Sequence, residues 1–240
     1  MLASIKRDQQ IILVLLYTLL LAGSLWHALD VLQDEMRLLA SPMIMAICLL
    51  LCFDCVRTVV DDGASRASGS REVLRLKHFK QKFLLWGLFV IVASFLLEFI
   101  GVQTGAIFGE YFYLDTLQPV LGSVPLVIGF AWLGMIISSI ALAQRITYSR
   151  TKSHFLVALL AAVFMVIFDF FMEPAAMKLG YWRWTENTIP LRNYLAWFVF
   201  GGIFSYIGVR LGLFKRKISI VAVHAYVAQL LYFLIVNLSR

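Results

Sequence analysis

The sequence predicts an all-α, polytopic membrane helical bundle, and three observations favour this class. Hydrophobic residues make up 61% of the 240 residues and charged residues only 15%, whereas soluble domains average about 45–50% and 25%. The mean hydropathy is +0.85. The apolar runs are continuous and about twenty residues long, the length at which a helix crosses a bilayer. Membrane β-strands would instead alternate apolar and polar residues, so a barrel is excluded.

About seven transmembrane helices are predicted, at residues 11–29, 38–59, 83–102, 121–143, 154–172, 194–214 and 218–238. Each run ends where a polar or charged connection begins, in order 30–37, 60–82, 103–120, 144–153, 173–193 and 215–217. Pro174 is expected to end the fifth helix, because the residue before a proline disfavours helical geometry. We expect a single transmembrane domain over residues 1–240, with a flexible Gly/Ser-rich linker at about 60–72.

The basic residues predict the orientation of the bundle. Most of the 21 Lys and Arg residues fall in the N-terminus and in the second, fourth and sixth connections. The opposite side holds Arg37, Lys178, Arg183, Arg192 and Arg240. The positive-inside rule then places the N-terminus in the cytoplasm and the C-terminus outside, in the cell membrane. The net charge of +7 is explained by this pattern, so no nucleic-acid partner is expected.

Two local features have simple interpretations. Lys6-Arg7 before an apolar run could belong to a signal peptide, but the run is long and lacks a clean cleavage site, which favours a first span. Cys48, Cys52 and Cys55 share one helix face and are interpreted as packing residues. We expect no metal site, since a zinc ion would need further ligands nearby.

Ionisable side chains inside spans are costly, so they are candidate functional residues. Glu98 lies late in the third predicted helix and Asp169 late in the fifth, with Glu173 one turn further. His27 and Asp30 end the first helix. All five are predicted near the outer face. These acids could be interfacial or paired with Arg183 and Arg192, or they could include a protonated carboxylic acid that serves as a general acid.

One other buried acid, Asp54, lies toward the cytoplasm. Arg57 follows it by three residues, and we interpret the two as a local ion pair. The two long outer connections are rich in aromatic residues. Such residues form interfacial belts, but beside protonatable acids they would also suit a pocket that stabilises a cation.

An ordered set of motifs, from Glu98 to Trp197, resembles a known family. It consists of Glu98-x-x-Gly101-x-x-Thr104-Gly105-x-x-Phe108-Gly109-x-Tyr111-x-Tyr113, then Pro119, Gly122, Pro125-Leu126 and Trp132, then Asp169-x-x-x-Glu173-Pro174-x-Ala176, Gly180-x-Trp182-x-Trp184 and Ile189-Pro190-x-x-Asn193-Tyr194-x-x-Trp197. The set is similar to the integral-membrane carotenoid 1',2'-hydratases, including the bisanhydrobacterioruberin hydratases. One departure is Glu173, where Asp is commoner in the family.

The resemblance implies hydration of the terminal C=C of an acyclic, ψ-end carotenoid, giving a tertiary alcohol through a tertiary carbocation. Its partners would be the carotenoid, water and the bilayer, and no cofactor would be required. From their depth and side-chain type, we predict Glu98 and Asp169 as the acid and the base, in either order, with Glu173 as a third catalytic carboxylate. The predicted substrate-binding residues are Thr104, Phe108, Tyr111, Tyr113, Trp182, Trp184 and Asn193, together with His27 and Asp30, which are selected by their depth.

Three other functions remain open. A membrane lycopene-type cyclase would use the same protonation, although its Pro-x-Glu-Glu pattern is absent from this sequence. A retinal protein would need a lysine in the middle of the last helix, and 218–238 contains none. A third alternative is a small transporter or a non-catalytic membrane subunit. Transporters often show paired broken helices in two halves, and the sequence shows no such symmetry. The particular carotenoid, the number of ends that react, the oligomeric state and the host lineage stay open.

Overall fold

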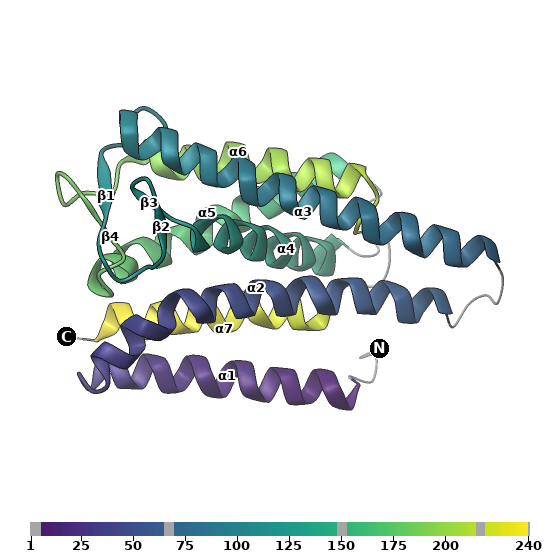
Figure 1. The fold of residues 1–240 in the computed structure, drawn as a ribbon, viewed down its shortest axis with the longest axis horizontal. Helices are drawn as coiled ribbons and strands as arrows, with labels where there is room; N and C mark the ends of the chain where they lie inside the picture. Colours follow the sequence, from purple (N-terminus) through teal and green to yellow (C-terminus); the bar gives the residue numbers. More distant parts are fainter. Residues whose placement is uncertain (1–5, 65–69, 148–152, 215–218, 240) are drawn as a thin grey trace.

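The structure is a computed structural model that describes residues 6–64, 70–147, 153–214 and 219–239. Within these ranges it is a bundle of seven helices (Figure 1): α1 (Arg7–Ala28), α2 (Gln33–Ala64), α3 (Ser70–Thr104), α4 (Val127–Thr147), α5 (His154–Lys178), α6 (Leu191–Arg210) and α7 (Ile220–Leu238). Four short strands lie at one end: β1 (Tyr111–Tyr113), β2 (Val120–Leu121), β3 (Val124–Pro125) and β4 (Trp182–Trp184). The predicted all-α polytopic bundle is confirmed.

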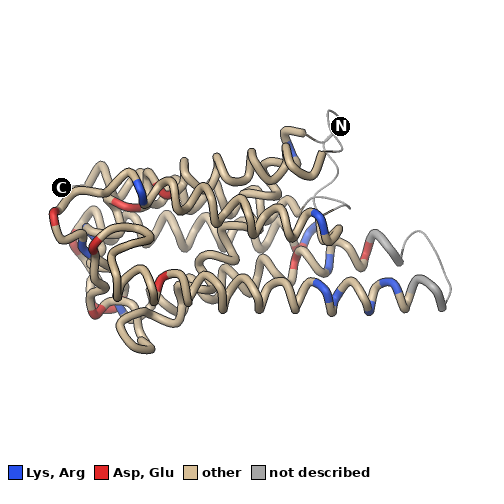
Figure 2. Tube along the Cα trace, turned by 90° about the horizontal axis from the view of Figure 1, so that it is seen from above, with Lys and Arg blue, Asp and Glu red and all other residues tan. Residues whose placement is uncertain are grey.

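Six of the described helices, all except α6, are long and apolar enough to cross a membrane. The described chain begins and ends at opposite ends of the bundle (Figure 1), and charged residues gather toward these two ends (Figure 2). We call the end that holds β1, β4 and the C-terminus the C-terminal end. That arrangement fits a multi-pass membrane protein.

Several helices begin or end away from the predicted bounds, and three of these differences bear on the connections and the site. Residues 60–64 and 70–72 of the predicted linker are helical, and its remaining residues, 65–69, lie outside the described residues. The fourth helix begins at Val127 rather than at 121, because residues 120–125 form the β2–β3 hairpin. The prediction that Pro174 ends the fifth helix was wrong, since α5 continues to Lys178.

Packing explains why α5 continues past its proline. Pro174 removes one backbone donor from the helix, but the following residues Ala175 and Ala176 are completely buried. Continuing the helix keeps these two alanines in the core and holds Glu173 at a fixed point of the bundle. Tertiary packing therefore outweighs the local preference of the pre-proline residue.

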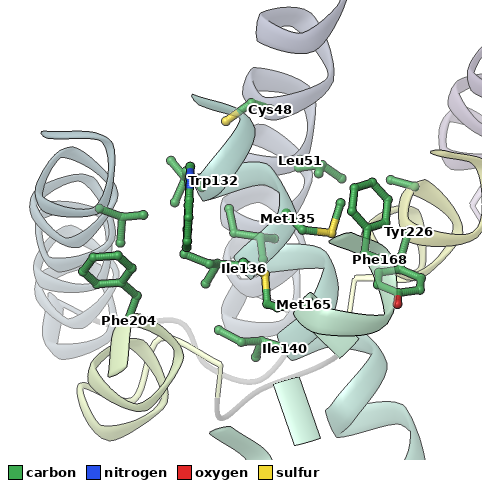
Figure 3. Close-up of a cluster of buried hydrophobic side chains, with 14 of the residues drawn as sticks. Cys48, Leu51, Trp132, Met135, Ile136, Ile140, Met165, Phe168, Phe204 and Tyr226 are labelled. Carbon is green, nitrogen blue, oxygen red and sulfur yellow. The ribbon is translucent and has the colours of Figure 1, made fainter. Parts of the chain in front are cut away.

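Helix α4 forms the centre of the bundle, and most of its length is buried. Figure 3 shows Trp132, Met135, Ile136 and Ile140 of α4 among side chains from α2, α5, α6 and α7. Small residues allow close approach: a Cβ on Gly129 would lie 2.6 Å from the carbonyl oxygen of Ile91 in α3. This close packing sets the positions of α3 and α5, whose ends bear the candidate carboxylates.

Asp54 is not paired with Arg57, so that interpretation was wrong. Its Oδ1 accepts a hydrogen bond from Nε2 of Gln9 at 3.1 Å, and its Oδ2 accepts one from Oγ of Ser219 at 2.5 Å. Ser219 is the N-cap of α7, so Asp54 connects α1, α2 and α7. Arg57 forms ion pairs with Asp8 and Asp61 instead, because these acids are at the accessible end of the bundle.

Candidate active site

A two-stranded antiparallel ribbon covers the C-terminal end of the bundle. Its register pairs Tyr111 with Trp184 and Tyr113 with Trp182. Side chains alternate between the two faces of a strand, so these four aromatic rings share the inner face. The middle pair, Phe112 and Arg183, is exposed on the other face. The ribbon therefore presents two phenol hydroxyls and two indole N–H groups to the helices below it.

Glu98, near the end of α3, receives three of the site's donors. Its Oε2 accepts hydrogen bonds from the hydroxyls of Tyr111 and Tyr113, the latter at 3.0 Å. Its Oε1 accepts a bond from Nε1 of Trp132 at 2.9 Å. The residue is 5% exposed. A buried carboxylate that is surrounded by donors in this way is well satisfied without a cationic partner.

Glu173, one turn before the end of α5, is held in a similar way. Its Oε2 accepts from the indole N–H groups of Trp182 at 2.9 Å and Trp184 at 2.8 Å. Its Oε1 accepts from Nδ2 of Asn193 at 3.2 Å. The two indole N–H groups and the amide NH₂ group can only donate hydrogen bonds. Each of them therefore favours a negative charge on Glu173.

Asp169 lies one turn before Glu173 and is fully buried. Its Oδ2 accepts from the same Nδ2 of Asn193, at 2.7 Å. Its Oδ1 is buried and has no hydrogen-bond partner among the described residues. Asn193, in the first turn of α6, thus connects the two acids through one amide group.

Within the described ranges, no basic side chain forms an ion pair with these acids. Among the described residues, the ion pairs within 4.0 Å involve other acids, and none includes Glu98, Asp169 or Glu173. The alternative in which they pair with Arg183 and Arg192 is therefore not what the structure shows. The donors are aromatic and amide groups, which leaves the site polar but without a fixed positive charge.

The tyrosines act as donors because they remain protonated. Burial, with the nearby carboxylate of Glu98, raises the pKa of both Tyr111 and Tyr113 above the ordinary phenol value. Both hydroxyls therefore keep their protons at any physiological pH and direct them at Glu98. The ribbon supplies fixed donors rather than titrating groups.

A cavity of about 90 Å³ lies between the carboxyl groups. The residues that line it next to the acids are Glu98, Phe108, Tyr111, Tyr113, Trp132, Glu173, Trp182, Trp184, Asn193 and Trp197. The rest of its wall is mostly apolar and includes Ile44 and Ile47 from α2, Phe168 from α5 and Phe233 from α7, beside the polar Gln229 of α7. The indole rings of Trp132 and Trp197 are stacked with centroids 4.4 Å apart. This combination of carboxyl groups and aromatic faces suits a positively charged intermediate.

Gly101 determines how closely the loop after α3 can approach. A Cβ at this position would lie 2.6 Å from the ring of Phe108. With glycine, Phe108 is buried and contacts Tyr111 edge to face, with centroids 6.2 Å apart. The glycine thus allows the loop to fold back and bring Tyr111 to Glu98.

Most of the residues predicted for the site come together. Glu98, Glu173, Phe108, Tyr111, Tyr113, Trp182, Trp184 and Asn193 line the cavity. Asp169 lies directly behind it, joined through Asn193. Trp132 and Trp197 also line it. Both belong to the motif set, but they were not predicted as site residues, because a single Trp within an apolar helix does not by itself indicate a site.

Three predicted residues do not reach the cavity. The hydroxyl of Thr104 donates to Ile100 of its own helix at 2.7 Å, and its side chain is exposed. His27 lines a neighbouring cavity instead. Asp30 is exposed in the α1–α2 turn, with φ of 56°. The sequence placed His27 and Asp30 at the same predicted depth as the acids. It could not show that α1 packs on α7, away from the acids.

Comparison with known proteins identifies the family. The profile of the family described as carotenoid biosynthesis protein matches residues 63–239, about three quarters of the chain and all three acids. This chain belongs to the carotenoid biosynthesis protein family. The chain is also similar to a protein from Haloarcula japonica, named bisanhydrobacterioruberin hydratase, with 26% identity over 114 residues.

The match to that relative is partial. It covers 46% of this chain and 39% of the relative, so the chain spans well under two thirds of the relative's length. No solved structure matches. The family membership and the membrane-spanning helices together establish a multi-pass membrane protein of carotenoid biosynthesis.

Proposed function

We propose that this protein is a hydro-lyase that adds water to the terminal C=C of an acyclic, ψ-end carotenoid. The observation that supports it most directly is the pair of buried carboxyl groups, Glu98 and Glu173, on either side of one aromatic cavity. Such a site can protonate an alkene, stabilise the resulting cation and accept a proton from water. The relative named as a hydratase is consistent with this chemistry.

Hydrogen-bond donors suggest where the transferable proton resides. Glu98 and Glu173 each accept three donors, whereas Asp169 accepts one and its Oδ1 has no partner. Two negative charges side by side in a buried place would be costly, so the Asp169–Glu173 pair would hold one proton. The smaller number of donors favours that proton on Asp169, and it would pass to the adjacent Glu173, which lines the cavity and would transfer it to the alkene.

The proposed reaction then has two steps. The proton forms a C–H bond at the less substituted alkene carbon, which leaves a tertiary cation at the other carbon. Water forms a C–O bond to that cation and gives one proton to Glu98. Proton transfer through solvent restores the starting state, so atoms and charges balance without any redox cofactor.

Aromatic faces would stabilise the intermediate. The stacked Trp132 and Trp197 and the tilted pair Tyr111 and Trp184, with centroids 5.0 Å apart, present π-faces and edges around the cavity. A cation over such rings gains about 0.5–2 kcal/mol per ring, more when water is excluded. The ionised Glu98 would add a larger electrostatic contribution in this dry environment.

The size of the cavity favours binding of one end group at a time. About 90 Å³ accommodates a branched hydrocarbon end but not a whole carotenoid. The remaining polyene would extend along the apolar wall formed by α2, α5 and α7 toward the lipid. Under the orientation expected from the basic residues, the site would lie toward the outer face of the membrane.

Expression in a bacterial host engineered to make lycopene or another ψ-end carotenoid tests the proposal. Hydration predicts a more polar pigment that is heavier by one water and has an unchanged absorption spectrum, because the conjugated chain is untouched. A product of unchanged mass with a shorter chromophore would indicate a cyclase instead. No product with any ψ-end carotenoid would contradict the enzymatic proposal, and specific ligand transport would then favour a transporter.

A further inference from the structure

A second cavity, of about 350 Å³, lies at the C-terminal end beside the first. Its basic residues come from four elements: His27 from α1, Arg37 from α2, Lys178 from α5 and Arg183 from β4. No acidic residue is among the described residues that line it. This second cavity, which we call the vestibule, is therefore polar and large enough for several waters.

Tyr181 is common to the two cavities. It lines both the carboxylate cavity and the vestibule, and its neighbour Trp182 donates to Glu173. Its backbone is fixed, because its N–H donates to Ala176 at 2.9 Å and its carbonyl accepts from Leu114 at 2.9 Å. Its hydroxyl interacts with that of Tyr232, which also lines the vestibule. Tyr181 thus borders both spaces, and it is the one described residue that their linings share.

The polar atoms of the vestibule fit a hydrated space. Nδ1 of His27 is buried and has no hydrogen-bond partner among the described residues. Buried polar atoms of this kind are normally satisfied by ordered water. Lys178, by contrast, donates to the carbonyls of Val236, Asn237 and Ser239, so its ammonium group already has acceptors within the protein.

We propose that the vestibule delivers the water consumed in the reaction and that Tyr181 is the gate through which each water passes. This inference rests on the proposed hydratase function, in which water is the second substrate. The polyene and the water would then enter by different routes, the polyene along the apolar wall and the water past Tyr181. Such separation keeps bulk water away from the cation until the end group is seated.

The chemistry provides a readout for the water supply. A cation that receives no water loses a proton from a neighbouring carbon and becomes an alkene again. When the reaction is run in D₂O, the proton that is added is deuterium, so alkene that forms again from the cation acquires deuterium. The ratio of hydrated product to deuterium-labelled alkene therefore reports how readily water reaches the cation.

Thr116→Trp places a bulky side chain in the vestibule, since Thr116 lines it and does not line the carboxylate cavity. The matched control is Phe112→Trp, on the exposed face of the ribbon. We expect Thr116→Trp to lower the ratio about tenfold while protonation continues, and Phe112→Trp to leave it at the wild-type value. Tyr181→Ala should raise the ratio.

The outcomes separate the two proposals. A wild-type protein that yields neither hydrate nor labelled alkene would overturn the hydratase function itself. Labelling with an unchanged ratio in Thr116→Trp and Tyr181→Ala would overturn the water route alone. If Thr116→Trp fails to fold, Tyr181→Ala decides, because an unchanged or lower ratio in that variant contradicts a gate at this position.

Discussion

Tyr111 and Trp184 are cross-strand partners in one ribbon, yet they donate to different acids: Tyr111 to Glu98 of α3 and Trp184 to Glu173 of α5. Their ring centroids are 5.0 Å apart. The register of a three-residue ribbon therefore sets the spacing between two carboxyl groups on separate helices. Tyr113 and Trp182 repeat the relationship one step further along.

Replacing Glu98 by Gln should nearly abolish hydration, because the amide can neither stabilise the cation by charge nor accept a proton. We expect a loss of about 10²–10⁴-fold, the range for a general acid or base. The measurement is hydrated carotenoid per unit of purified protein. The matched control is Glu110→Gln on the following exposed segment, which should retain activity. Wild-type turnover by Glu98→Gln would remove Glu98 from the mechanism.

Asp169→Asn and Glu173→Gln should each reduce activity by about 10²-fold or more, since the two acids share one proton. The double variant should be no slower than the slower single variant, because residues that act as one unit are not additive. Rates of all three variants test this. Multiplicative losses in the double variant would show that the acids act independently.

Trp184→Phe should destabilise the protein, because it leaves Oε2 of Glu173 with one buried donor instead of two. Loss of such a bond costs about 1–3 kcal/mol. Thermal unfolding in detergent, followed by circular dichroism, measures the change. Trp26→Phe is the matched control, since Trp26 is 38% exposed. Equal midpoints for the two variants would contradict the donor's role.

Thr104→Val should keep activity within about twofold, as surface substitutions usually do. Its hydroxyl donates to Ile100 of α3 and is remote from the cavity. Unchanged activity would show that Thr104 has a structural role in the motif and takes no part in the reaction. Product analysis beside wild type suffices, and a large drop in hydration would place Thr104 in the site after all.

Alkaline pH should destabilise the fold through Tyr111 and Tyr113. Their pKa values are raised in the folded protein, so the unfolded chain releases these protons first, above about pH 10. Their contribution to stability is present below that pH and is lost as the pH rises toward the folded-state values. The slope of unfolding free energy against pH between about 9 and 11 should be shallower in a Tyr111→Phe, Tyr113→Phe variant. An unchanged slope would contradict this.

Sequence patterns predicted the class and much of the site because both follow from local features. Long apolar runs require helices in lipid, where every backbone group must be satisfied within the segment. Acids within those runs stand out because they are costly there. In this way Glu98, Asp169 and Glu173 could be selected, and the aromatic residues beside them followed from the ordered motif set.

Failures occurred where position depended on packing. His27 and Asp30 have the right chemistry and the expected depth, but α1 packs on α7 and not beside α3 or α5. Pro174 predicts a helix end locally, but the buried Ala175 and Ala176 keep α5 helical. Asp54 accepts hydrogen bonds from Gln9 and Ser219 and does not pair with its neighbour Arg57, because α1, α2 and α7 meet at that point.

By itself, then, the sequence determined that this chain is a helical membrane protein with acids and aromatic residues near the ends of its spans. Hydropathy and residue type are properties of each segment and need no partner. Only the tertiary structure decided which acids meet. The antiparallel register of β1 and β4 directs two tyrosines to Glu98 and two tryptophans to Glu173, and a register arises only when two distant segments pair.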